Sequence, residues 1–160
     1  MKHLFIWGSC FFFLFFVGGC SKSKFVPTEY VEGIVTLDGE AVPEGTSVTF
    51  HPTGGSGEPA GGLTNKDGLY KLTSASGAPE KGALEGDYKI VVHKKDIVSY
   101  AGEEYGEIRA DAPRDSYGNP MMSTSHDVLP VVYSQVSRTP LSYTVVKGKQ
   151  THNIELQSNP

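Results

Sequence analysis

The sequence predicts an all-β fold, an antiparallel β-sandwich of about seven short strands with one long loop excursion. Apolar and polar residues alternate with a period of two in several short segments, which is typical of strands with one buried face. Turn signals such as Asp38-Gly39 and Lys147-Gly148-Lys149 separate these segments. No segment has the apolar period of an amphipathic helix. Strands at such regular spacing favour a sandwich over a sheet covered by helices.

The predicted strands follow one another from Tyr30 to the C-terminus. Residues 30–37 form the first, and Gly33 within it indicates a bulge or a close approach of another backbone. Residues 53–62 are rich in Gly and Ser, which predicts a loop, and Asn65-Lys66-Asp67-Gly68 predicts a hairpin turn. The side chains expected to face the core are Val31, Val35, Leu37, Val48, Phe50, Tyr70, Leu72, Tyr88, Ile90, Val92, Leu141, Tyr143, Val145, Ile154 and Leu156.

Residues 94–128 interrupt this pattern. They are polar, and they contain Gly, Pro, Ser and several charges. A loop of this length is unusual in a compact domain and tends to be functional or disordered. We therefore expect a loop excursion between two core strands, loosely packed in its middle and docked back onto the sandwich at residues 128–133. Its tyrosines, Tyr100, Tyr105 and Tyr117, are candidate ligand contacts.

The N-terminus has the features of a secretory signal peptide. Lys2 and His3 form a short basic head, and an apolar run from Leu4 to Val17 follows. This run is shorter than the ~20 apolar residues of a membrane-spanning helix. The expected signal peptide covers residues 1–19.

The end of this segment resembles the bacterial lipobox. In Val17-Gly18-Gly19-Cys20, an aliphatic residue and two small residues precede a cysteine. The resemblance implies that the Cys20 thiol receives a diacylglycerol, that a peptidase cuts before it, and that the new amine is acylated. Two acyl chains anchor a protein stably, since each buried methylene contributes about 0.8 kcal/mol. The alternatives are secretion without a lipid and an uncleaved signal anchor. Cys10 is a poor rival, because Trp7-Gly8-Ser9 precedes it.

Residues 20–28 are then a lipidated tether, and residues 29–157 form one domain. Without residues 1–19 the chain has 13 basic and 18 acidic residues, a formal charge of −5. This balance argues against nucleic acid as a partner. Cys20 is the only cysteine left, so no disulfide is expected. Lys22 and Lys24 are candidate contacts to anionic head groups, although a solvated linker is the simpler interpretation.

Several segments resemble the carboxypeptidase-regulatory-like domain, a transthyretin-like sandwich common in bacterial lipoproteins. The matching segments are residues 31–39, 42–45, 48–50, 65–72 and 84–92, with Leu129-Pro130, Tyr133 and Thr139-Pro140-Leu141 towards the end. The resemblance covers nearly all of the domain except residues 94–128, and it implies a Greek-key, immunoglobulin-like topology. Because these motifs encode turns and core positions, the resemblance implies no activity. The chain also lacks the Tyr-Arg-Gly-Ser motif of the transthyretin-like hydroxyisourate hydrolases at its end, Leu156–Pro160.

The sequence contains only weak candidates for a metal site or a catalytic site. The domain's histidines, at positions 51, 93, 126 and 152, have no ligand spacing between them. The carboxylates of the excursion are candidate calcium ligands, but they lack EF-hand spacing and a solvated acidic loop is the simpler interpretation. These residues are Glu103, Glu104, Glu107, Asp111 and Asp115. Ser125-His126-Asp127 has the residue types of a catalytic triad, but neighbours in one segment cannot generally meet as one. We expect no metal, no cofactor and no enzyme activity.

Two functions from different classes remain open. The first is a non-catalytic envelope module, held by its lipid anchor, that binds another envelope protein or a polymer through loops or a strand edge. The second is a receptor for a small ligand or glycan that assists uptake, and an enzyme is a distant third. Ser21, rather than Asp, follows Cys20. By analogy with sorting in Gram-negative envelopes, this favours the outer membrane.

Overall fold

The computed structural model describes residues 26–54, 57–76, 82–103 and 106–160. The predicted signal peptide, Cys20 and most of the tether lie outside the described residues, as do Glu104 and Tyr105. Within the described residues no helix is long and apolar enough to cross a bilayer. The helical structure there is one short 3-10 turn, η1 (Val131–Ser134), and the remaining elements are strands. The predicted all-β fold class is confirmed.

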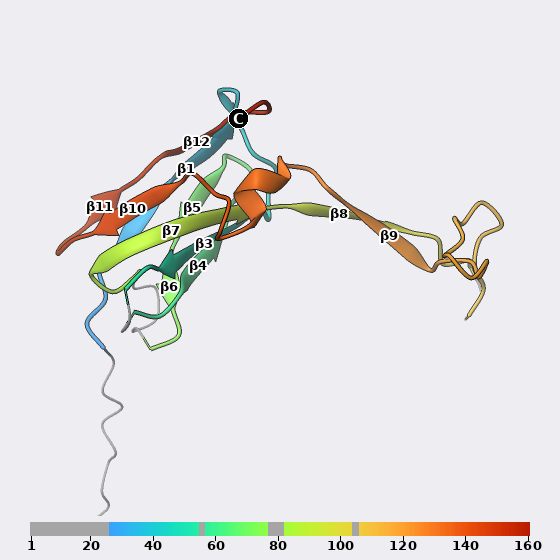
Figure 1. The fold of residues 1–160 in the computed structure, drawn as a ribbon, viewed down its shortest axis with the longest axis horizontal. Helices are drawn as coiled ribbons and strands as arrows, with labels where there is room; N and C mark the ends of the chain where they lie inside the picture. The colour runs from blue at the N-terminus through green and yellow to red at the C-terminus, as the bar shows by residue number, and fades with distance from the viewer. Residues whose placement is uncertain (1–25, 55–56, 77–81, 104–105) are drawn as a thin grey trace, which may run out of the picture.

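Two five-stranded sheets pack against each other in the described part of the chain (Figure 1). In the first, β1 is central and pairs with β11, β12, β2 and β5, and in the second the order is β10-β7-β3-β4-β6. The first sheet contains β1 Val31–Leu37, β2 Glu40–Ala41, β5 Leu69–Lys71, β11 Gln150–Thr151 and β12 Ile154–Leu156. The second contains β3 Ser47–Pro52, β4 Ala60–Leu63, β6 Thr73–Ser74, β7 Gly86–His93 and β10 Ser142–Val145. The pairs are antiparallel except that β11 and β12 run parallel to β1.

The hydrophobic core lies between the two sheets. Every side chain predicted to face the core is buried or packs against the buried cluster. The Phe50 ring lies centrally, 5.9 Å from Tyr88 and 6.3 Å from Tyr70 between ring centroids. The Tyr70 hydroxyl donates to the His152 carbonyl at 2.7 Å, and the Tyr88 hydroxyl donates to the Leu84 carbonyl at 2.9 Å. Burial raises the pKa of both phenols, and each has the partner that a buried hydroxyl needs.

Gly33 confirms the predicted close approach of two backbones. A Cβ built on Gly33 would lie 1.8 Å from the His152 carbonyl oxygen, far inside van der Waals contact. The same carbonyl accepts the Tyr70 hydroxyl. Glycine at this position therefore lets β1 and the chain between β11 and β12 share one hydrogen-bonded junction.

Strand β4 begins inside the segment that we predicted to be a loop. Gly62, one of the glycines that predicted the loop, lies in this strand and allows it to pass close to another backbone. A Cβ on Gly62 would lie 2.1 Å from the Lys71 carbonyl oxygen. Glycine at this position therefore reflects tight packing between two chain segments, whereas the described residues of the predicted loop before β4 form no strand.

The turn at Asn65–Gly68 forms as predicted, but the strands it joins are not a hairpin. The Asn65 Oδ1 accepts the backbone N–H groups of Asp67 and Leu69, both at 2.9 Å. On either side of it, β4 pairs with β3 and β6, whereas β5 pairs with β1. The turn therefore carries the chain from one sheet to the other, because each strand finds a longer partner in a different sheet.

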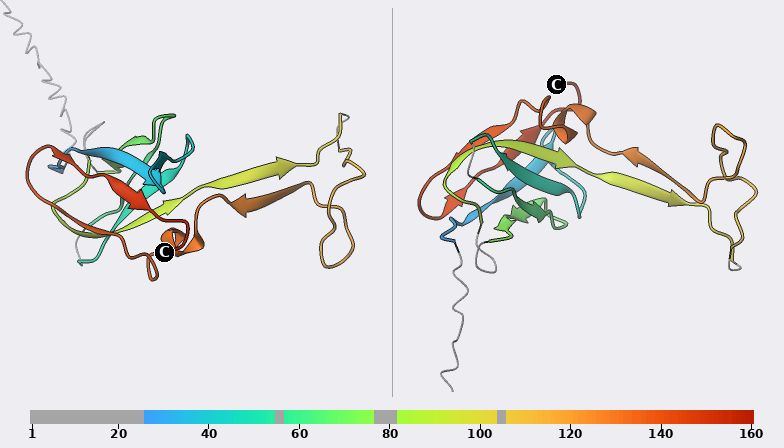
Figure 2. Two further views of the ribbon diagram at one scale, coloured as in Figure 1. Left: turned by 90° about the horizontal axis from the view of Figure 1, so that it is seen from above. Right: turned by 60° about the horizontal axis from the view of Figure 1, so that its bottom comes forward.

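The excursion of residues 94–128 leaves after β7 and returns before β10, as predicted, but its ends are not a loop. Strand β8 (Lys95–Ser99) pairs antiparallel with β9 (Ser123–Asp127). This ribbon projects away from the sandwich, with the connecting residues at its far end (Figure 2). We call β8, β9 and residues 100–122 the arm. The expected loop excursion is present, but its paired ends were not predicted, because the polar composition of β9 hides a pairing partner for β8.

Candidate functional site

The base of the arm is fixed to the sandwich. The Lys94 Nζ donates to the Glu44 carbonyl at 2.8 Å, and the Lys94 carbonyl accepts the Val128 N–H at 2.9 Å. The chain after the arm docks back as predicted, with Leu129 and Tyr133 buried. The two strands of the arm therefore start next to residues that are bonded to the sandwich or buried in it, and they extend beyond the core.

The arm itself buries almost nothing. All residues of β8 are exposed, and in β9 only Thr124 is partly covered. Ile97 is 73% exposed and Val98 is 41% exposed. An isolated two-stranded ribbon is marginally stable in water and needs further strands or a packed face. The described residues of the arm give the ribbon neither a further strand nor a packed face.

The hydrogen-bond ladder leaves a defined set of backbone groups on each outer edge. Val128 donates to Lys94 at the base and Tyr100 donates to Met122 at the far end, at 2.9 and 2.8 Å. Because hydrogen-bonded pairs alternate in an antiparallel ribbon, the intervening pairs point their N–H and C=O groups outwards. These pairs are Lys95 with Asp127, Ile97 with Ser125, and Ser99 with Ser123.

Charges occupy only the half of the ribbon nearest the sandwich. Lys95 lies opposite Asp127, and Asp96 lies opposite His126. The distal half consists of Ile97–Ser99 opposite Ser123–Ser125 and carries no charge. Charged side chains commonly protect strand edges from pairing with another chain, so the distal half is the unprotected part.

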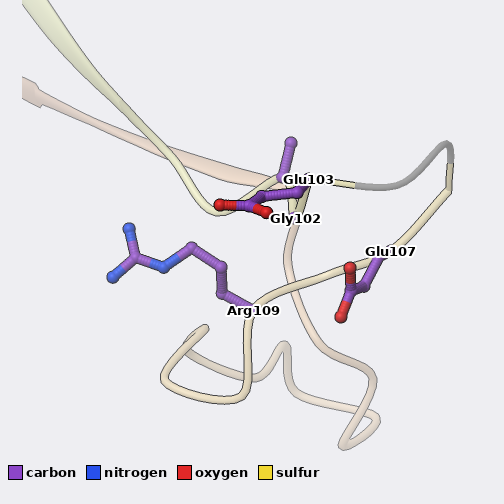
Figure 3. Close-up of a pocket in the computed structure, with 5 residues that line it drawn as sticks. Gly102, Glu103, Glu107 and Arg109 are labelled. Carbon is purple, nitrogen blue, oxygen red and sulfur yellow. The ribbon is translucent and has the colours of Figure 1, made fainter.

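A small turn at the far end of the arm surrounds an open hollow. Ala101 bridges to Ile108, and the Gly102 N–H donates to the Glu107 carbonyl at 2.8 Å. Ala101, Gly102, Glu103, Glu107 and Arg109 line the hollow. The charged side chains that Figure 3 labels do not converge on one point. The described residues that line the hollow therefore do not form an organised set of ligands.

A second loop at the far end is ordered by Asp115. Its Oδ1 accepts the N–H groups of Tyr117 and Asn119, both at 2.9 Å, and the Arg114 guanidinium donates to the Gly118 carbonyl at 2.7 Å. These backbone hydrogen bonds lower the pKa of Asp115. Tyr117 is 89% exposed on this loop.

The calcium candidates that the structure describes, Glu103, Glu107, Asp111 and Asp115, lie in the connecting residues at the far end of the arm. Asp111 forms an ion pair with Arg109 at 2.6 Å, and both side chains are more than half exposed. The Asp115 carboxylate accepts hydrogen bonds from the backbone of its own loop. Among the described residues no three His, Cys, Asp or Glu side chains form a group able to hold a metal.

The sandwich histidines lie far apart in the strand layout. His51 is on β3 and His93 ends β7. His152 is partly buried between β11 and β12, where its ring stacks on Tyr143 at 4.0 Å. Burial lowers the pKa of His152.

Ser125, His126 and Asp127 are consecutive residues of β9, so successive side chains point to opposite faces of the ribbon. His126 instead lies 4.0 Å from Asp96 across the ribbon. The strand does not bring the three together as a triad.

The sequence singled out the segment that forms the arm, but it did not predict the paired strands of the ribbon or their outer edges. The signal was the β-branched pair Ile97-Val98 within a polar segment, and β9 supplied no apolar period to match it. Comparisons of the chain with protein-family models, with curated proteins and with solved structures found no match.

Proposed function

We propose that the protein is a non-catalytic, lipid-anchored module of the bacterial cell envelope and that its arm binds another envelope protein. The observation that carries the proposal is a ribbon with both faces exposed and with exposed Ile97 and Val98, built on a fixed base. The lipobox-like Cys20 and the resemblance to the carboxypeptidase-regulatory-like domain support the envelope location.

The position of the arm fits this role. Glu29, where the tether enters the domain, bridges to Ala83 just before β7 begins. The arm starts after β7 ends, so the eight residues of β7, about 27 Å at strand rise, separate the two points. In Figure 1 the start of the described chain and the arm lie at opposite ends of the sandwich. A protein anchored through Cys20 would hold its arm away from the membrane.

The alternative function, a glycan receptor, is favoured by one observation. Tyr117 is almost fully exposed on an ordered loop, and exposed aromatic rings stack on sugars. Tyr117→Ala separates the two functions. It should abolish glycan binding if the loop is a sugar site, and it should leave capture by the ribbon largely intact.

The proposal is tested by removing the arm from the lipidated protein. Because the Val128 N–H already donates to the Lys94 carbonyl, a short Gly-Ser linker can join these residues. The wild-type protein, the armless variant and Tyr117→Ala are each used to capture proteins from native envelopes, and captured proteins are quantified by mass spectrometry. We expect specific partners to be lost from the armless variant and kept by Tyr117→Ala. Equal capture by the wild-type protein and the armless variant would refute the role of the arm.

Lipidation is tested separately by metabolic labelling with a tagged fatty acid. Cys20→Ser should abolish the label, and Cys10→Ser serves as the matched control that should keep it. Label that persists in Cys20→Ser would refute the anchor and leave the question of the arm open to the capture experiment.

A further inference from the structure

We propose that the outer edge of β8 binds an extended, basic segment of the partner protein as an added β-strand. This inference rests on the proposed function, because it names how the arm recognises its partner. Strand addition uses main-chain hydrogen bonds for affinity and alternate side chains for specificity.

The backbone of β8 offers a regular row of hydrogen-bonding groups. By the alternation of the ladder, Lys95, Ile97 and Ser99 direct their N–H and C=O groups away from β9. These groups repeat at every second residue, which is the spacing of an extended polypeptide. A polysaccharide has no groups at that repeat, so the occupant is a polypeptide.

The β8 edge is the better of the two edges. Ile97 and Val98 provide exposed apolar side chains next to that row, and cross-strand apolar pairs stabilise an added strand. The β9 edge offers Ser123, Ser125 and Asp127 instead. Each edge has a protecting charge at its base, Lys95 on β8 and Asp127 on β9, and a serine at its far end. The two edges therefore differ in the middle, where Ile97 lies opposite Ser125.

The net charge of the arm indicates the composition of the segment that binds to the β8 edge. Residues 94–128 carry seven acidic and four basic residues, a formal charge of −3. An incoming strand with Lys or Arg among its β-branched residues therefore gains electrostatic attraction, which also speeds association. A second copy of the arm carries the same negative charge and would be repelled. The occupant is therefore a basic segment of a different protein.

The test uses the full lipidated chain in neutral phosphatidylcholine vesicles, so that the lipid does not attract basic peptides. A random library of dodecapeptides is the first probe. We expect enrichment of peptides that alternate β-branched or aromatic residues with Lys or Arg. Enrichment of no peptide, or of peptides without that alternation, would overturn the proposal.

The second probe is the enriched peptide itself, with its Kd measured by fluorescence anisotropy. Ile97→Pro removes one outward N–H from the β8 edge without touching the inward ladder, and proline is tolerated on edge strands. Ser125→Pro makes the matched change directly opposite, on the β9 edge. We expect binding at least tenfold weaker for Ile97→Pro and unchanged for Ser125→Pro. The reverse result, or equal binding by both variants, would overturn the assignment of the β8 edge.

A change in the peptide avoids any question about folding of the variants. Methylation of the backbone nitrogens at every second residue keeps the side chains and charges but removes one row of donors. One methylated frame should lose binding, and the other should keep it. Equal binding by both frames and the unmodified peptide would mean that side chains alone are recognised, which overturns strand addition.

Two further outcomes separate this inference from the proposed function. If the armless variant loses its envelope partners but Ile97→Pro keeps them, the arm binds partners and the β8 edge does not. If sedimentation shows the wild-type chain to be a dimer and Ile97→Pro to be a monomer, a second copy is the occupant and the basic segment is wrong.

Discussion

Strands β7 and β8 are consecutive and similar in composition, yet they lie in opposite environments. One residue, Lys94, separates them, and both contain β-branched residues. Val92 in β7 is fully buried, whereas Ile97 in β8 is 73% exposed. The difference shows that the sandwich is stabilised by its own core, whereas the apolar residues of the arm are exposed and add little to the stability of the fold. We propose that these exposed apolar residues serve recognition.

The largest expected contrast comes from truncating one isoleucine in each strand. Ile90→Ala empties a fully buried position, and such changes typically cost about 2–5 kcal/mol of unfolding free energy. Ile97→Ala, the matched control on the arm, should change it by less than about 0.5 kcal/mol. Urea unfolding of both variants measures the difference. Similar losses would mean that the arm belongs to the folding core.

A second contrast concerns two glycines of the sandwich. Gly33→Ala places a Cβ against the His152 carbonyl, and overpacking of this kind costs about 1–3 kcal/mol or more. Gly54→Ala is the control, because nothing lies within 4 Å of a Cβ at Gly54. Thermal melting compares the two variants. A Gly33→Ala protein as stable as the wild type would show that β1 shifts freely and that the junction at His152 is not tight.

The pH dependence of stability should arise in the sandwich. Burial lowers the pKa of His152 in the folded state, so the unfolded chain binds more protons as the pH falls below about 6.5. The free energy of unfolding should therefore decrease from about pH 7.5 to about pH 5. His152→Phe keeps an aromatic ring beside Tyr143 without a titrating group, and it should flatten this decrease. Parallel profiles for the two proteins would assign the pH dependence to other groups.

The smallest expected effect is that of removing the arm. Joining Lys94 to Val128 through a Gly-Ser linker deletes residues that bury almost nothing, and shortening a loop changes closure entropy only slightly. The unfolding free energy should change by less than about 0.5 kcal/mol. Urea denaturation of the armless variant that is proposed for the capture experiment measures this change. A loss comparable to that of Ile90→Ala would contradict the separation of arm and core.

The sandwich was predictable because burial acts locally on its strands. Val48 with Phe50 and Tyr88 with Ile90 alternate with polar neighbours, and each pair faces the core as expected. Pairing between strands that are distant in the sequence was harder to predict. Neither the parallel pairing of β1 with the C-terminal strands nor the crossing at Asn65 follows from any local pattern.

The segment that forms the arm could be singled out from the sequence, but its structure could not. The polar excursion interrupts the strand pattern of the sandwich, but Ser123–Asp127 has neither apolar alternation nor high apolar content. Its strand forms because β8 supplies the partner backbone, and backbone pairing leaves no trace in side-chain polarity. The edge carrying Ile97 therefore required the structure.

Hydrogen exchange across the junction of β7 and β8 tests the central claim most directly. The Ile90 N–H donates to the Leu141 carbonyl within the core, so it should exchange only through global unfolding. The Val98 N–H lies in the inward ladder of an unsupported ribbon and should exchange orders of magnitude faster, through local opening of the arm. Equal protection of the two amides in the free protein would contradict the account, because the arm would then be part of the folded core.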